Sequence, residues 1–142
     1  MAQFAFNVGK TLVVQGKANA GVTTLRAACI YGTKTGINED LTTMAAIDAV
    51  TSVVLSTERV TLTSVTVTTD QTDNRAEIDC AAFAFAADAG QTALAIVIYD
   101  ATTNTDDTTR IPVAFFDTNF GAGIAMDGGL NVSIPTELLY VA

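Results

Sequence analysis

The sequence contains no histidine and no tryptophan. Histidine is the commonest general base and metal ligand, so its absence excludes Ser-His-Asp and Cys-His catalysis and the usual zinc sites. The chain also lacks the GxGxxG and Walker phosphate-binding motifs. Its glycine-rich stretch "GAGIAMDGG" has no phosphate-loop lysine and precedes a predicted strand rather than a helix. We therefore expect a protein that is not an enzyme and that needs no cofactor.

Positively charged residues are scarce. Seven lysines and arginines stand against 15 acidic residues, which gives a net charge of −8. Nucleic-acid backbones and anionic membranes both require clustered lysine and arginine. Neither is therefore expected as a partner. The acidic charge favours solubility or, alternatively, docking onto a basic protein surface.

Long apolar runs are absent, and no segment approaches the roughly 18 apolar residues of a membrane helix. The opening "MAQFAFNVGK" lacks the basic region and apolar run of a secretory signal. These features are typical of a chain made in a reducing cytosol. Its two cysteines, Cys29 and Cys80, lie in apolar segments. We expect buried free thiols, and a single disulfide between neighbouring strands is the alternative.

Apolar residues and threonine are abundant. Hydrophobic residues make up 49% of the 142 residues, and 23 residues are threonine. Threonine is the polar residue that best fits a half-exposed strand. The composition predicts an all-β fold in a single domain, residues 1–142, as a β-sandwich or barrel-like antiparallel structure. Residues 1–20 are expected to form an N-terminal arm or a short helix.

Local patterns place the individual elements. Residues 59–70 form the clearest strand, and a slip in alternation at Ser64–Val65 indicates a β-bulge or a change of face. Residues 92–100 are continuously apolar, as in a strand buried on both faces. Pro112, in a strand at 109–117, should lie at an edge or a bulge. The remaining predicted segments are a helix at 4–17, strands at 22–31, 75–85, 130–135 and 138–141, one or two helical turns at 41–50, and loops at 32–40 and 118–129.

Two carboxylates, Glu77 and Asp79, would share one face of the predicted strand 75–85. A glycosidase also uses two carboxylates. Such a pair needs an aromatic, polar cleft for the sugar, and the chain has no tryptophan. We interpret Glu77 and Asp79 as part of a solvated strand face.

A polar stretch, "DATTNTDDTTR", separates the strands at 92–100 and 109–117 and holds Asp100, Asn104, Asp106 and Asp107. Calcium needs six to eight oxygen ligands held by a turn of fixed geometry. The stretch has neither the glycine nor the terminal glutamate of an EF-hand loop. Asparagine, aspartate and threonine are also typical turn residues. The sequence therefore predicts a hairpin tip and no metal site, with adventitious calcium binding as the alternative.

Read as a series of segments, the chain resembles a family of small structural proteins from tailed bacteriophage particles. The resemblance begins with a glycine-lysine pair before a second glycine, "NVGKTLVVQGKAN", and a strand ending near a tyrosine, "LRAACIYG". It continues through "LTTMAAIDAV". The most specific part is the series "ALAIVIYD", "RIPVAFFD", "NFGAGIAMDGG", "LNVSIP" and "LLYVA". The similarity extends over nearly the whole chain.

The resemblance implies a virion component, first of all a decoration protein that binds the outside of the capsid and stabilises it. The implied partner is the major capsid protein, and we expect a homo-oligomer, with a trimer as the favoured state. A neck or tail accessory protein and a host-binding fibre module remain alternatives, as does a small glycan- or peptide-binding β-sandwich. Two features depart from the family: Ile134–Pro135 stands where a tryptophan is frequent, and the hairpin tip is long.

Two segments are candidates for the interface with such a partner. Phe4 and Phe6 lie outside the predicted strands, so residues 1–8 could reach across to a neighbouring subunit, or the two rings could cap the chain's own core. The loop at 118–128 is the second candidate. The candidate interface residues are Phe4, Phe6, Phe120, Ile124 and Met126.

Overall fold

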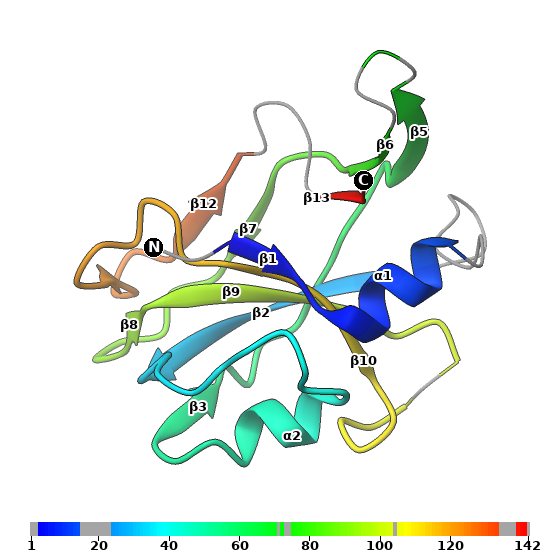
Figure 1. Cartoon of the computed structure of the whole chain (residues 1–142). Helices are drawn as coiled ribbons and strands as arrows, with labels where there is room; N and C mark the ends of the chain where they lie inside the picture. The colour runs from blue at the N-terminus through cyan, green and yellow to red at the C-terminus, as the bar shows by residue number, and fades with distance from the viewer. Residues whose placement is uncertain are drawn as a thin grey trace.

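The computed structural model describes residues 3–14, 24–70, 72, 75–103, 105–133 and 139–141. Short strands dominate, and two short helices accompany them (Figure 1). The predicted all-β fold is therefore confirmed. The elements in chain order are β1 Gln3–Ala5, α1 Asn7–Val14, β2 Leu25–Gly32, α2 Met44–Asp48, β3 Val53–Leu55, β4 Val60–Thr61, β5 Thr66–Asp70, β6 Arg75–Asp79, β7 Phe83–Phe85, β8 Thr92–Ala93, β9 Ala95–Asp100, β10 Ile111–Phe116, β11 Ile124–Ala125, β12 Leu130–Val132 and β13 Leu139–Val141.

The largest sheet is antiparallel, with the strand order β1-β10-β9-β2-β3. The eight-residue strand β2 pairs along one edge with both β3 and β4. Three small sheets complete the fold: β11 with β8, β12 with β7, and the three-stranded sheet β13-β6-β5. Neither helix in the described part of the chain is long and apolar enough to cross a membrane.

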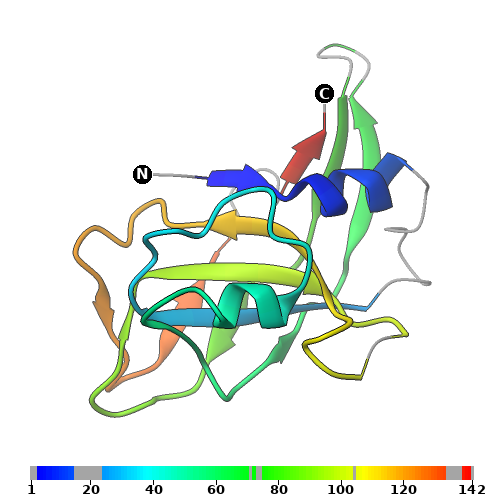
Figure 2. The same cartoon turned by 60° about the horizontal axis from the view of Figure 1, so that its bottom comes forward.

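Strand β9 lies at the centre of the main sheet and is buried on both faces. Ile96 and Ile98 point into one apolar cluster, and Val97 and Tyr99 point into the other. This confirms the prediction for residues 95–100, whereas Thr92 and Ala93 form the separate strand β8, which pairs with β11. The first cluster includes residues of β7, β8 and the 118–129 segment, whereas the second includes Met44 and Ile47 of α2. Helix α2 and the strands β7 and β12 accordingly cover opposite faces of the main sheet (Figure 2).

The slip in alternation at Ser64–Val65 marks a change of sheet. β4 pairs with β2 in the main sheet, whereas β5 pairs with β6 in the three-stranded sheet. Between them the backbone of Ser64 adopts a left-handed conformation with φ 53°. The slip therefore marks the passage from one strand to another in a different sheet, rather than a bulge or a change of face within one strand, and the single predicted strand at 59–70 is divided in two. Pro112 lies at a bulge as predicted, because the register of β10 on β9 shifts between Pro112 and Ala114.

Several short strands were missed or merged by the sequence patterns. β3 and β11 have three and two residues, too few to display an alternating pattern. The predicted strand at 75–85 is two strands, β6 and β7, which join different sheets. The predicted helix at 4–17 begins later, at Asn7, because residues 3–5 form β1. Residues 15–20 of the expected N-terminal arm lie outside the described residues.

Candidate functional site

The N-terminal segment is an integral part of the main sheet. β1 pairs with β10, and the Phe6 amide donates to the Val113 carbonyl at 3.0 Å. The Phe4 ring stacks on Phe115 with centroids 4.9 Å apart and meets the Phe6 ring edge-on at 5.2 Å. Phe6 is fully buried and Phe4 half-buried. The expectation that Phe4 lies outside the strands is wrong, because Phe4 belongs to β1. Phe6 lies just after β1, and its amide continues the pairing with β10.

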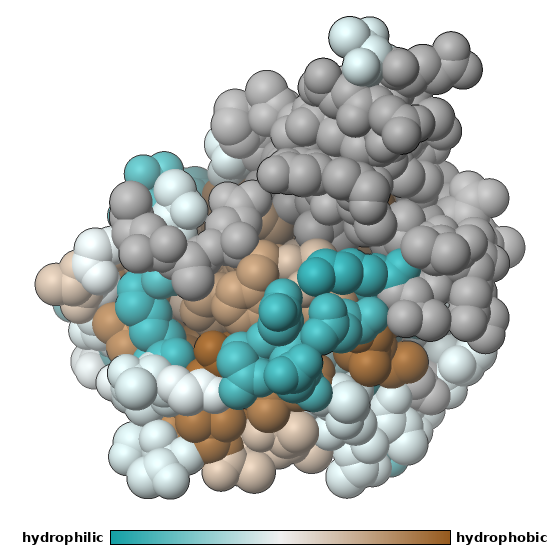
Figure 3. Space-filling view, viewed as in Figure 1, coloured by the Kyte–Doolittle hydropathy of each residue, from teal (hydrophilic) through white to brown (hydrophobic). Residues whose placement is uncertain are grey.

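Helix α1 is also held against the body of the molecule. The Asn7 amide donates to the Glu39 carbonyl at 2.9 Å, and the Asn7 side chain donates to Asp40 at 2.8 Å. A Cβ atom at Gly9 would lie 2.6 Å from Val113 Cα, so glycine permits the helix backbone to approach β10 closely. The loop after β2 and the start of α1 form a hydrophilic band on this face (Figure 3). Residues 7–10 are therefore committed to contacts within the chain.

The second candidate segment, 118–128, also turns its apolar side chains inward. Phe120 is 8% exposed and Met126 is fully buried, and both belong to the same cluster as Ile98. Ile124 is half-buried and pairs through β11 with Ala93 of β8. The structure thus places three of the five candidate interface residues, Phe6, Phe120 and Met126, in the chain's own core.

The polar stretch after β9 is a hairpin connection, as predicted, because Asp100 pairs with Ile111 across β9 and β10. Asp100 accepts from the Thr102 amide at 2.9 Å. Asp106 accepts from the hydroxyl and amide of Thr108, and these hydrogen bonds lower the pKa of Asp106. Local turn contacts therefore occupy these carboxylates. Asn104 lies outside the described residues, and among those described no three acidic or cysteine side chains are placed to hold a metal.

The structure describes the side chains of both cysteines and of one of the two paired carboxylates that the sequence pointed out. The Asp79 carboxylate accepts from the Cys80 amide at 2.7 Å, while the Glu77 side chain lies outside the described part. Cys29 and Cys80 are buried and free, which confirms the prediction of unpaired thiols. Burial raises the pKa of the Cys29 thiol to about 12 and that of Cys80 to about 11. Neither thiol is therefore an activated nucleophile.

The sheet formed by β13, β6 and β5 stands away from the main sheet (Figure 2). In this sheet β13 lies beside β1 of the main sheet. The middle strand β6 pairs with β13 on one side and with β5 on the other. β5 pairs only with β6, and in the described part of the chain no strand covers its outer edge. Such an edge presents unpaired backbone amide and carbonyl groups that another strand can bind. We define this edge of residues 66–70 as the open β5 edge.

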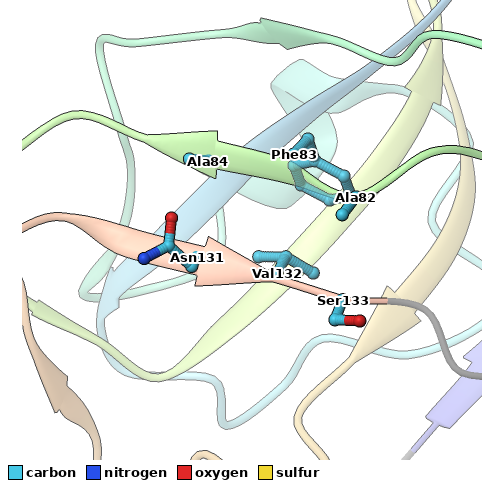
Figure 4. Close-up of a pocket in the computed structure, with 6 residues that line it drawn as sticks. All are labelled: Ala82, Phe83, Ala84, Asn131, Val132 and Ser133. Carbon is cyan, nitrogen blue, oxygen red and sulfur yellow. The ribbon is translucent and has the colours of Figure 1, made fainter.

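A shallow hollow of about 300 Å³ lies over β7 and β12 (Figure 4). None of the side chains that line it is charged, and two of the six are polar. The six are Ala82, Phe83, Ala84, Asn131, Val132 and Ser133. One aromatic ring, that of Phe83, and no ionisable side chain line the hollow.

A cluster of arginines around a buried tyrosine was not found from the sequence. Arg59 and Arg110 both bind the Asp107 carboxylate, at 3.0 and 2.9 Å. Their guanidinium carbons lie 5.7 and 5.6 Å from the centre of the Tyr99 ring. The arginines are far apart in the chain, and no local pattern links them. Only the pairing of β2, β4, β9 and β10 brings them together.

Comparison of the chain with protein-family models, with curated proteins and with solved structures finds no match. A function must therefore be inferred from the residues and from the surfaces described above.

Proposed function

We propose that this chain is a non-enzymatic structural protein of a tailed bacteriophage particle, which decorates the outside of the capsid and stabilises the shell. Its partner is the major capsid protein, and its working form is a homo-oligomer, with a trimer suited to local three-fold axes of the shell. The sequence resemblance to small phage structural proteins supports this function. The net charge of −8 is compatible with docking onto a basic protein surface.

The observation that carries the proposal is the open β5 edge on a sheet that stands away from the main body. The two segments first considered as anchors bury apolar side chains in the chain itself: Ala5 and Phe6 in the first, and Phe120 and Met126 in the second. An edge strand can bind a partner through its backbone without giving up core contacts. The β5 edge is therefore the better candidate for attachment.

The length and composition of β5 distinguish it from the other strands that end a sheet. β5 has five residues, whereas β1, β3, β7, β12 and β13 have three and the remaining terminal strands two. Natural proteins commonly protect an edge by making it short or by placing lysine or proline on it. β5 reads "TVTTD" and contains neither. An edge of this length without such protection suits pairing with a strand of another subunit.

Attachment through one short strand gives a modest free energy for each site. An oligomer that engages several shell subunits at once gains effective concentration, and its overall affinity exceeds that of a single contact. Attachment through a single short strand therefore requires the proposed oligomer, because only several simultaneous contacts give a high overall affinity.

Binding of the chain to undecorated heads tests the proposal. Successive amides of an antiparallel strand point alternately toward and away from the paired strand. Of Val67→Pro and Thr68→Pro, one should disrupt the pairing with β6 and the other should remove only an outward amide. We expect the variant that keeps the wild-type melting temperature to lose head binding.

Val54→Thr on the terminal strand β3 is the control, because Val54 is 50% exposed and the substitution leaves every backbone amide of the main sheet in place. If both the stable β5 variant and wild type bind heads equally, attachment through β5 is wrong. If wild type itself does not bind heads, the decoration role is wrong.

A further inference from the structure

The arginine cluster holds three guanidinium groups close to the Tyr99 side chain. Arg26, Arg59 and Arg110 are three of the four arginines in a chain of net charge −8. Arg26 donates to the Arg59 carbonyl at 3.1 Å, and Arg59 and Arg110 share Asp107. The Arg59 and Arg110 side chains are only 16% and 17% exposed. Such half-enclosed positive charge favours an anionic ligand.

Three buried donors in this cluster have no acceptor among the residues that the structure describes. They are the Tyr99 hydroxyl, Arg59 Nη1 and Arg26 Nε. Tyr99 is fully buried, and an unpaired buried hydroxyl is unfavourable because it has given up its hydrogen bonds to water. A native structure rarely leaves such groups unsatisfied without a ligand or an ordered water. An acceptor is therefore expected at this point.

The strand register brings these donors to the same place. Arg26 of β2 pairs directly with Tyr99 of β9, so the two side chains project from the same face of the main sheet. The Arg59 guanidinium lies against the Tyr99 ring. The hairpin tip that carries Asp107 is tied to α2, because the Ala45 amide donates to the Asp107 carbonyl at 2.7 Å. β2 and β9 run side by side in the main sheet, and the hairpin tip follows directly from the end of β9 (Figure 1).

We propose that the cluster of Arg26, Arg59, Tyr99, Arg110 and Asp107 binds one small inorganic anion, a halide or a compact oxyanion such as phosphate. The unpaired donors of Tyr99, Arg59 and Arg26 hold it, and Asp107 keeps the two flanking guanidinium groups in position. The low exposure of the arginines restricts the ligand to a small ion. The bound anion joins the hairpin tip to the main sheet and stabilises both. This site does not depend on the proposed attachment to a capsid.

Thermal unfolding in different sodium salts tests the site. The salts are gluconate, chloride and phosphate at equal ionic strength and equal pH, so that only the identity of the anion changes. Gluconate is too bulky for the cluster. We expect the melting temperature of the wild type to rise with chloride or phosphate in a saturable manner, and the comparison of the two distinguishes a halide from an oxyanion.

Tyr99→Phe is the decisive variant, since it removes only the hydroxyl. In chloride or phosphate it should bind at least about tenfold more weakly than wild type, which corresponds to about 1.4 kcal/mol. In gluconate it should be at least as stable as wild type, because the hydroxyl there lacks a partner. Lys10→Gln, which removes an exposed cation outside the cluster, should respond to the salts as wild type does.

Crystals soaked in sodium bromide give an independent measurement. The proposal expects an anomalous bromide peak within hydrogen-bond distance of Tyr99 Oη or Arg59 Nη1. It is wrong if only water occupies that position and the melting temperature is the same in every salt. It is equally wrong if Tyr99→Phe keeps the full response to the anion.

Discussion

Lys34 Nζ lies 2.7 Å from the Asp117 carboxylate, although 83 residues separate the two in the chain. Asp117 directly follows β10 and is only 3% exposed. Lys34 begins the loop whose Ile37 and Leu41 pack on the same apolar cluster as α2. The ion pair therefore fixes this loop over one face of the main sheet. It also gives a positively charged partner to one of the few buried carboxylates in the described structure.

Lys34→Met should lower the free energy of unfolding by about 1–3 kcal/mol, because it deprives a buried carboxylate of a charged partner. The partial exposure of Lys34, 31%, keeps the expected loss below that of a fully buried pair. Lys10→Met is the matched control, since the Lys10–Glu39 pair is 41% and 54% exposed and should contribute less than about 1 kcal/mol. Urea unfolding measures both, and equal losses would contradict the account.

Gly9→Ala should destabilise the protein by about 1–3 kcal/mol, although alanine normally stabilises a helix. The added methyl group would lie 2.6 Å from Val113 Cα and 2.7 Å from the Val113 carbonyl oxygen. The backbone of α1 must then move away from β10. Gly128→Ala, where a Cβ meets nothing within 4 Å, should be nearly neutral. A stabilising effect of Gly9→Ala in thermal unfolding would show that the helix is not packed this closely.

Phe6→Ala should cost about 3–5 kcal/mol, because the ring is fully buried between β1 and the core. Phe4→Ala should cost less, since that ring is only half-buried against Phe115. Val54→Ala, at 50% exposure, is the control and should have little effect. Urea unfolding compares the three. If Phe6→Ala were as stable as wild type but failed to bind heads, the N-terminal arm would be the anchor after all.

Both thiols should resist modification in the folded state. Burial raises the pKa of Cys29 to about 12 and that of Cys80 to about 11, from 9.0 in an unfolded chain. At pH 8 a disulfide reagent should therefore label neither thiol until denaturant is added. Above pH 9 the unfolded chain loses protons that the folded chain retains, so stability should fall between about pH 9 and pH 12. Rapid labelling at pH 8 without denaturant would contradict this burial.

The sequence patterns predicted the strands that are long enough for their pattern of apolar and polar residues to show which faces are buried. The apolar run at 92–100 predicted a strand buried on both faces, which is correct for residues 95–100, and Pro112 correctly predicted a bulge. β3 and β11 were missed because strands of two or three residues have no measurable period. Their existence depends on pairing with β2 and β8, which is tertiary information.

The candidate interface was harder to predict than the fold. Apolar residues outside the recognised strands, such as Phe6 and Met126, could equally serve a partner or the chain's own core, and only packing decides. The open β5 edge could not be found either, because the sequence does not say which strand ends a sheet. The arginine cluster around Tyr99 depends on four strands that are separated in sequence.

The proposed capsid-decorating role is tested most directly by locating the chain on phage particles purified from a culture that produces it. Electron cryomicroscopy of the particles, with quantitative mass spectrometry of the same sample, gives both position and copy number. A decoration protein should be present on the order of hundreds of copies at symmetric sites on the outer surface of the head. Absence from the particles, or a few copies confined to the neck, tail or fibres, would contradict a capsid-decorating role.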